Sequence, residues 1–358
     1  MNIHFQSRKK ITCLLAAGII ASTTASAVFT PATAEASTAS ILGAAIGGWK
    51  AHADLDKALH KYNDTEEGRQ EYFQAMKKQY GVNNDWALNQ QLDRIMTNLT
   101  AAIGAVDPSI YQKPYNYFIN NENTFNAFCT LGHNLSVNTG LYNVLTNEDE
   151  IAVVLGHELG HGQKDHPAKG ARRSLNMAIL GSATGTNAGA IMATVINNRH
   201  ITKPMEREAD ALAFDYITHT NYNPGATAAV WQRVMDLSQS NPSGLQAFLS
   251  DHPANDDRRD VYAKKLTTYS GGHVTNKDGT VKVNTKVFTT PAAAGGMSSH
   301  ERSYFVMGNL CAAYHNGHNR STAYANGNTV MLGDQPIMTC VDGDEPAATL
   351  AARLNQIK

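Results

Sequence analysis

The clearest hydrophobic pattern in the chain begins at Trp86. Apolar residues there recur at steps of three and four, and this spacing places them on one face of a helix: Leu88, Leu92, Ile95, Met96, Leu99 and Ile103. The dipeptide Asp107-Pro108 follows and is typical of a turn. We therefore predict an amphipathic helix that starts near Trp86 and is closed by Asp107-Pro108.

The pattern changes between Tyr115 and Gly140, where the sequence reads YNYFINNENTFNAFCTLGHNLSVNTG. Aromatic and β-branched residues are interrupted there by Asn and Gly, which is typical of short strands joined by turns. We expect a small antiparallel sheet in this segment.

Helical patterns resume after the predicted sheet. Asn147 is followed three residues later by Glu150, a capping-box arrangement in front of an apolar run. Pro204 should open another helix that runs to Asn221, and two more are expected at about 225–240 and 256–269. Residues 174–197 are rich in Ala, Gly, Met and Ile, but their centre, GSATGTNAG, predicts a helical hairpin rather than a continuous span.

The remaining segment, residues 271–358, differs in pattern. SGGHVTNKDGTVKVNTKVF predicts a hairpin that turns at Lys277-Asp278-Gly279, and TTPAAAGGMSS is typical of a linker. The sequence shows no evident internal repeat. The fold class expected is α+β, mostly helical, with a main domain at 37–270, a hairpin and linker at 271–299 and a small C-terminal module at 300–358 whose role the sequence does not assign.

The N-terminus has the layout of a secretory signal peptide. A basic SRKK precedes the apolar run ITCLLAAGII, and small-x-small triplets end at Ala27 and Ala36. An apolar run of about ten residues is shorter than the ~20 that a membrane span needs. We expect residues 1–36 to be removed by cleavage after Ala27 or Ala36 and the protein to be exported to the periplasm or secreted.

Charge and cysteine content narrow the function classes. The formal net charge is -1 and no Lys/Arg run follows residue 10, so no nucleic-acid partner is expected. Export implies an oxidising compartment in which cysteines are disulfide candidates. We expect a bridge between Cys311 and Cys340 and a buried, unbridged Cys129.

The candidate chemistry lies in HELGH. His157 and His161 are four residues apart, so they project from one face of a helix as a shared metal requires. Glu158 falls among the apolar residues of that helix, where an unpaired carboxylate is costly. A zinc-bound water beside it would supply a partner, with Glu158 as the general base.

Two histidines leave zinc short of a third protein ligand. KPMEREADALAFDY places Glu206 and Asp210 four residues apart at the start of a helix, so both can face the same point. An ordinary acidic first turn, favoured by the helix dipole, is the alternative. Glu208 is a competing ligand candidate, although it should face elsewhere.

HELGH, EREAD and DHPANDDR in this order resemble the zinc metallopeptidase family of HtpX, the CAAX prenyl endopeptidases and BepA, and most of all its soluble periplasmic BepA-like branch. The resemblance covers about Trp86 to Lys265. It implies a zincin-type (gluzincin) fold and one Zn²⁺ per chain. His157, His161 and Glu206 would be its ligands, and Asp210 would orient a ligand histidine.

The resemblance extends to two further segments. His252 matches the family's His-Pro loop, where it would either stabilise the oxyanion or cap the zinc, while Arg258 would tie down the loop. NAFCTLGHNLSVNTGL is similar to the family's strand that binds extended substrate, which points to Asn126, Ala127 and Phe128. Cys129-Thr130 departs from the family's usual residues at the edge of that strand.

Other histidines have weaker claims. His166 lies about 180° from His157 on an ideal helix, so a structural role near the site is expected of it. His315 and His318 are spaced like ligands but lie among Asn and Gly without further candidates, so surface positions are expected.

The function expected is that of an exported zinc-dependent endopeptidase acting on unfolded or misassembled envelope proteins. Its partners would be polypeptide substrates, together with a membrane surface or an outer-membrane protein. A chaperone-like assembly factor with latent or gated protease activity is the alternative, and a structural zinc protein is a third reading. The intact Glu158 favours an enzyme, because binding alone needs no general base.

Overall fold

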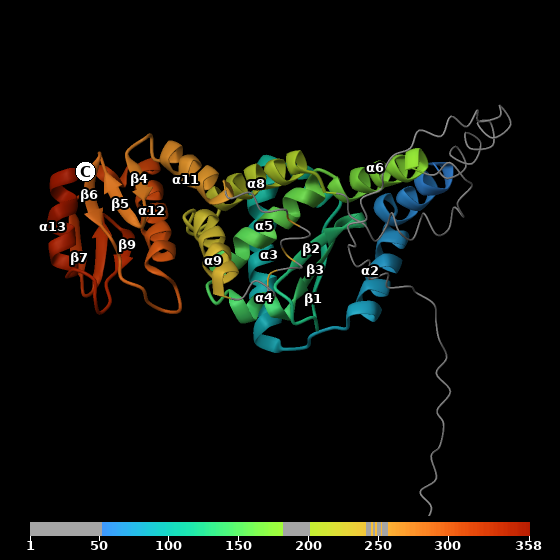
Figure 1. Cartoon of the computed structure of the whole chain (residues 1–358), viewed down its shortest axis with the longest axis horizontal. Coiled ribbons are helices and arrows are strands. Elements are labelled where there is room, and N and C mark those ends of the chain that lie inside the picture. The colour runs from blue at the N-terminus through green and yellow to red at the C-terminus, as the bar shows by residue number, and fades with distance from the viewer. Residues whose placement is uncertain (1–51, 182–200, 241–244, 246–247, 249–251, 253–256) are drawn as a thin grey trace, which may run out of the picture. The chain divides into compact units, whose positions relative to one another are not determined.

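The computed structural model describes residues 52–181, 201–240, 245, 248, 252 and 257–358 (Figure 1). The predicted signal segment and most of the predicted 174–197 hairpin lie outside these residues. These residues form a mostly helical fold with three small sheets. Within the described part of the chain, no helix is both long and apolar enough to cross a bilayer.

The first sheet is mixed, not wholly antiparallel as predicted. Its strands are β1 (Asn116–Asn120), β2 (Ala127–Thr130) and β3 (Asn134–Asn138), in the order β1-β3-β2. The central β3 runs antiparallel to β2 but parallel to β1. The chain reverses between β1 and β2 and again between β2 and β3, so β3 runs in the same direction as β1, next to which it lies. The residue pattern of a strand gives no information on its direction.

The predicted helices are confirmed as α3 (Trp86–Val106), α5 (Glu148–Gln163), α8 (Lys203–Thr218), α9 (Ala226–Ser240) and α11 (Arg258–Tyr269). The structure adds α2 (Glu66–Tyr80) and α6 (His166–Gly181), which were not predicted, and the short η1 (His60–Asp64) and α4 (Thr139–Val144). The strands of this sheet are contacted by α2, α3, α4, α5 and α6. α5 lies in the middle and contacts α3, α8, α9 and β2.

Gly160 lets α5 and α8 approach each other closely. A Cβ on Gly160 would lie 3.2 Å from the backbone of Ala209, whereas one on Gly156 would lie at an ordinary contact distance of 3.9 Å from Ala213. The four-residue spacing of Gly156 and Gly160 puts both on the face that meets α8. The helix that carries His157 and the helix that carries Glu206 are therefore held at short range.

The predicted cap of α5 forms only in part. The Asn147 side chain accepts a hydrogen bond from the Asp149 N–H at 2.8 Å, as expected of an N-cap. Glu150 does not close the capping box. Its side chain is fully buried and faces Arg233 and Glu301 instead.

The C-terminal segment consists of two copies of one arrangement of three strands and a helix. The first copy is β4 (Val274–Lys277), β5 (Thr280–Val283), β6 (Lys286–Thr289) and α12 (Ser299–His315). The second is β7 (Ala323–Asn326), β8 (Thr329–Leu332), β9 (Gln335–Thr339) and α13 (Ala347–Ile357). The expected turn at Asp278-Gly279 is confirmed, with φ of 51° and 79°.

This internal repeat corrects the expectation drawn from the sequence. Register shifts occur at Val281/Lys282 in the first copy and at Val330/Met331 in the second. A threonine pair closes each sheet, Thr280 with Thr290 and Thr329 with Thr339. Each helix covers two strands of its own copy and one strand of the other, since α12 contacts β4, β5 and β9 and α13 contacts β7, β8 and β6.

The predicted Cys311–Cys340 bridge is wrong. Cys311 lies buried on α12 and Cys340 follows β9, and both remain reduced thiols. Cys129 is buried and unbridged, as expected.

The second half of α12 packs tightly against the main domain. A Cβ on Gly308 would lie 2.0 Å from the Asn223 side chain and 2.2 Å from the Gly225 nitrogen. Asn223 also donates to the Phe305 carbonyl oxygen and to Asn309, both at 3.0 Å. The C-terminal segment is therefore in direct contact with the start of α9.

Candidate metal centre

α5 and α8 bring the three predicted ligands together. His157 Nε2 and His161 Nε2 are 3.0 Å apart, and Glu206 Oε1 lies 3.2 Å from His161 Nε2. Glu206 Oε2 lies 3.4 Å from His157 Nε2. All three side chains are buried. Together with His252 they offer four ligand atoms that lie within 4.8 Å of one another.

The donor set fits a divalent cation such as zinc. Several buried atoms around the centre have no well-formed hydrogen bond to any described residue: Glu158 Oε1, Glu206 Oε1 and His252 Nε2. Burial lowers the pKa of His161 to about 4, so its imidazole is neutral, as a ligand must be. A cation between these nitrogens and the Glu206 carboxylate would satisfy groups that otherwise face one another unpaired.

The charge balance without a metal is carried by His157. Burial alone would lower the pKa of His157, but the Glu206 and Asp210 carboxylates raise it to about 9. His157 in turn holds the pKa of Glu206 far below its usual range against the effect of burial. A metal would replace the proton of His157 with its own positive charge.

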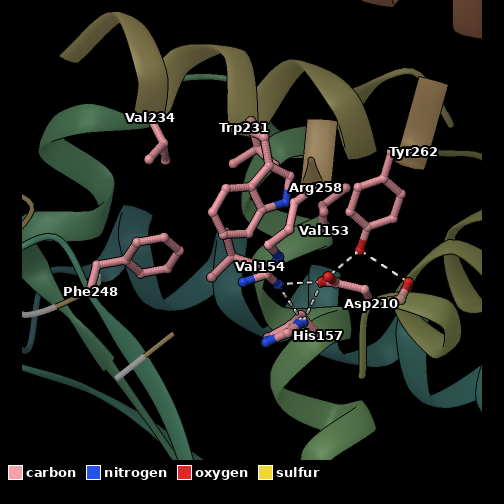
Figure 2. Close-up of a pocket in the computed structure, with 10 residues that line it drawn as sticks. Val153, Val154, His157, Asp210, Trp231, Val234, Phe248, Arg258 and Tyr262 are labelled. Carbon is pink, nitrogen blue, oxygen red and sulfur yellow. Dashed lines mark hydrogen bonds and ion pairs between the residues drawn. The ribbon is translucent and has the colours of Figure 1, made fainter. Parts of the chain in front are cut away.

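Asp210 and Arg258 form the second layer of the centre (Figure 2). Asp210 Oδ1 lies 3.0 Å from His157 Nδ1, a distance at which a carboxylate can orient a ligand histidine. Arg258 contacts Asp210 and donates to Glu206 Oε2 at 3.0 Å. Tyr262 donates to Asp210 as well, at 3.0 Å. Burial opposes ionisation of Asp210, yet Arg258 and His157 lower its pKa to about 2.

Arg258 makes contacts that were not predicted for it. Its guanidinium reaches two carboxylates of the centre, Glu206 and Asp210, and the Trp231 ring lies over it at 3.7 Å (Figure 2). Trp231 had no role in the sequence interpretation, because an aromatic residue on the apolar face of a helix is ordinary core. Its position beside Arg258 of α11 became visible only in the fold.

An apolar pocket lies beside His157. Figure 2 shows that the side chains of Trp231, Val234 and Phe248 line it, and Val153, Val154 and Val230 complete its apolar wall. His157, Asp210, Arg258 and Tyr262 form its polar end. The sequence interpretation did not identify this pocket, because its walls come from helices that are far apart in the chain.

Glu158 lies between the metal ligands and the sheet. The Cys129 N–H donates to Glu158 Oε2 at 2.8 Å, and His252 Nε2 is 3.2 Å from Glu158 Oε1. The side chain is almost fully buried. One carboxylate oxygen is thus held by the backbone of β2, while the other faces the centre.

His252 reaches the ligand set itself. Its Nδ1 lies 3.3 Å from His157 Nε2 and 3.4 Å from Glu206 Oε1. Its ring contacts Phe248, with ring centroids 5.0 Å apart. His252 is therefore within reach of any metal that these ligand atoms would hold.

The three residues of the predicted substrate strand lie at β2. Ala127 and Phe128 belong to β2 and Asn126 directly precedes it, and all three are buried. β3 pairs with one side of β2, and among the described strands β2 is at the edge of its sheet. The neighbouring Phe125 ring contacts Phe248 at 4.9 Å, so Phe248 lies next to this strand.

The other histidines lie as expected. His166 contacts the ligand His161, at 2.9 Å between the Nδ1 atoms. His315 is exposed and stacks on Tyr269, and His318 pairs with the exposed Asp334 at 2.7 Å. Among the described residues, neither of these last two belongs to a group that could hold a metal.

Residues 87–261 match the model of Peptidase family M48. The chain is 26% identical to the metalloprotease LoiP of Escherichia coli K12, over 45% of this chain and 66% of LoiP. It is 29% identical to the mitochondrial metalloendopeptidase OMA1 of Arabidopsis thaliana, over 40% of this chain and 30% of that protein. It is 25% identical to the beta-barrel assembly-enhancing protease of Yersinia pestis, over 52% of this chain and 40% of that protein. The chain therefore spans between 30% and 66% of the length of these curated relatives.

Proposed function

A peptidase family M48 domain spans residues 87–261 of this chain, and on that premise we propose that the protein is a zinc-dependent endopeptidase of the gluzincin type. His157, His161 and Glu206 would hold one Zn²⁺ per chain. The observation that carries the proposal is the position of Glu158, a buried carboxylate with one oxygen free of a well-formed hydrogen bond beside that ligand set. A purely structural metal site has no use for such a group.

The chemistry follows from the chain's own residues. Zinc, when bound, polarises a substrate carbonyl and makes a water molecule more acidic. Glu158 takes a proton from water at Oε1 and passes it to the leaving amine, while the Cys129 N–H holds Oε2 and fixes the carboxylate. Asp210 keeps the His157 ring oriented. An extended substrate would add to the edge of β2, at Asn126, Ala127 and Phe128.

We also propose where the enzyme acts. The secretory layout of residues 1–36 supports export to the periplasm or beyond. The similarity to proteases named for beta-barrel assembly supports substrates that are unfolded or misassembled envelope proteins, and contact with a membrane surface or an outer-membrane protein.

A gated form of this activity is the second candidate. The Nδ1 atom of His252 lies among the ligand atoms, where it would complete the coordination of the metal and leave no open position. In that state the chain would bind polypeptides as a chaperone-like factor, with proteolysis latent until His252 moves away.

The test is casein cleavage by the purified chain and its Glu158→Gln and His252→Ala variants, with and without a chelator. We expect wild-type cleavage that the chelator abolishes, and a loss of at least about a hundredfold in Glu158→Gln with one zinc still bound. Faster cleavage by His252→Ala supports the cap, and slower cleavage supports a role at the oxyanion. Cleavage that persists in Glu158→Gln contradicts the mechanism.

The chelator also distinguishes the proposed enzyme from the third alternative, a structural zinc protein. A structural zinc protein unfolds when its metal is removed. We expect the chelated chain to keep its circular dichroism spectrum, because Arg258, Asp210 and Tyr262 hold the ligand helices without the metal.

A further inference from the structure

The outer nitrogen of each ligand histidine has a partner, and the two partners differ in kind. His157 Nδ1 meets the buried carboxylate of Asp210. His161 Nδ1 instead meets a second imidazole, His166 Nδ1, at 2.9 Å. His166 Nε2 in turn lies 3.1 Å from Glu208 Oε2. His166 is 1% exposed and the Glu208 side chain 49%, so this chain of contacts runs from the buried centre to solvent.

A tight turn brings His166 to this position. α5 ends at Gln163, and the Asp165 N–H donates back to the Gly162 carbonyl oxygen at 2.8 Å. Asp165 has a φ of 54°, and Asn63 donates to its side chain at 3.0 Å. The reversal lets His166, at the start of α6, face His161, which an uninterrupted helix would not allow.

The donor and acceptor in each contact of the series His161–His166–Glu208 follow from the proposed ligand role of His161. If Nε2 of His161 holds a metal, the proton of its neutral ring is on Nδ1, which must donate. His166 Nδ1 must then accept, and the proton of the neutral His166 ring is on Nε2. That N–H donates to the Glu208 carboxylate, so every contact is satisfied by one arrangement of protons.

We propose that His166 and Glu208 are positioning residues for the metal centre: together they hold the His161 ring with Nε2 directed at the metal. This inference rests on the proposed zinc site. It assigns a role to Glu208, which was expected to face elsewhere. Glu208 would act on the centre through His166 and not as a metal ligand. Outer partners of this kind commonly set metal affinity by 10- to 100-fold.

The contacts that hold the His157 ring and those that hold the His161 ring should differ in strength. Asp210 is buried and is itself held by Arg258 and Tyr262. Glu208 is half exposed, so water can replace its oxygen as an acceptor for His166 Nε2. Loss of His166 should therefore weaken zinc binding more than loss of Glu208.

The experiment measures zinc affinity by competition with a chromophoric chelator, with no activity readout. We expect His166→Leu to bind zinc about 10- to 100-fold more weakly than wild type. His166→Asn, whose side-chain oxygen can accept where Nδ1 did, should recover most of the affinity. Glu208→Ala should lose a few-fold. Asp215→Ala is the matched control, because Asp215 is a half-exposed carboxylate of the same helix, 3.8 Å from His219, and should not change the affinity.

Wild-type affinity in His166→Leu overturns the proposal. So does an equal loss in His166→Leu and His166→Asn, because the contact then acts through packing and not through an acceptor. Thermal unfolding of each metal-free variant verifies that it is folded before its affinity is interpreted. A wild-type chain that binds no zinc overturns the proposed function instead, and the two failures are thereby distinguished.

Discussion

Cys129 donates its backbone N–H to Oε2 of Glu158 at 2.8 Å, and this hydrogen bond links β2 to the proposed general base. Both residues are buried. The strand expected to bind substrate and the carboxylate expected to move protons are thus part of one rigid unit. A change at Glu158 should consequently affect stability as well as catalysis.

We predict that Glu158→Gln and Glu158→Ala differ in stability. The glutamine carbonyl oxygen can still accept from the Cys129 N–H, whereas alanine removes the acceptor of this bond. Loss of a buried hydrogen-bond partner costs about 1–3 kcal/mol. Urea unfolding of the metal-free proteins should show Glu158→Ala less stable than Glu158→Gln by this amount, and equal midpoints would contradict the assigned contact.

Arg258 should be among the most sensitive positions in the main domain. Its guanidinium compensates the buried carboxylates of Glu206 and Asp210, and breaking a buried ion pair from one side costs about 3–5 kcal/mol. We expect Arg258→Met to lower the free energy of unfolding of the metal-free protein by that amount.

The neighbouring Arg259 is the control for that measurement. It donates to Gln232 at 2.9 Å and pairs with the exposed Asp260. Arg259→Met should therefore cost no more than about 1 kcal/mol. Similar losses at the two positions would show that the contacts of Arg258 with the ligands carry little energy.

Stability should depend on pH through Glu150. Burial, and then the nearby Glu301, raise the pKa of Glu150 to about 8, while Arg233 opposes the shift. Between about pH 5 and 8 the native state keeps a proton that the unfolded chain has lost, so stability falls as pH rises, by at most about 1.4 kcal/mol per pH unit. Above the pKa of Glu150 in the native state, Glu150 is ionised in both states and no longer makes the stability depend on pH.

Glu150→Gln tests this sign. The amide cannot ionise, so thermal unfolding of the variant should lose the decline over this pH window and should exceed the wild type in stability at pH 8. Asp149 and Asp236 also lie near the Glu150–Glu301 pair and keep their own contributions in both proteins. Parallel curves for the two proteins would contradict the assignment.

Two helical glycines should respond oppositely to alanine. A Cβ on Gly156 would meet nothing closer than 3.8 Å, so Gly156→Ala should be neutral or stabilise by up to about 1 kcal/mol through helix propensity. A Cβ on Gly308 would clash with Asn223 at 2.0 Å and with the Gly225 backbone. Gly308→Ala should destabilise by roughly 1–3 kcal/mol, as overpacking does. Calorimetry of both variants measures the difference, and a neutral Gly308→Ala would contradict the tight contact of α12 with α9.

The features of this protein that were predictable from its sequence are local to single helices. The helix of His157 and His161 was predictable because its apolar spacing, its Asn147 cap and the four-residue ligand step all lie within a few turns of chain. Glu158 was identified for the same reason, as a carboxylate on the buried arc. Glu206 needed more: the residues alone left it among alternatives, and the resemblance of the EREAD motif pointed to it.

The repeat at 274–357 was missed for a different reason. Its two copies share similar strand lengths, the position of a register shift and a closing threonine pair, but few residues. Period-two patterns in strands of four or five residues are too short to reveal a repeat when the side chains differ.

The sequence by itself determined the helices of the site and the proposed ligand histidines and base that they carry, because helical periodicity is a local property of the chain. Only the tertiary structure decided what surrounds them: Arg258 against Glu206, Trp231 over Arg258, and Glu208 behind His166. These contacts join elements whose separation in space is set by the packing of whole helices, such as the close approach of α5 and α8 at Gly160. No spacing along the chain encodes that distance.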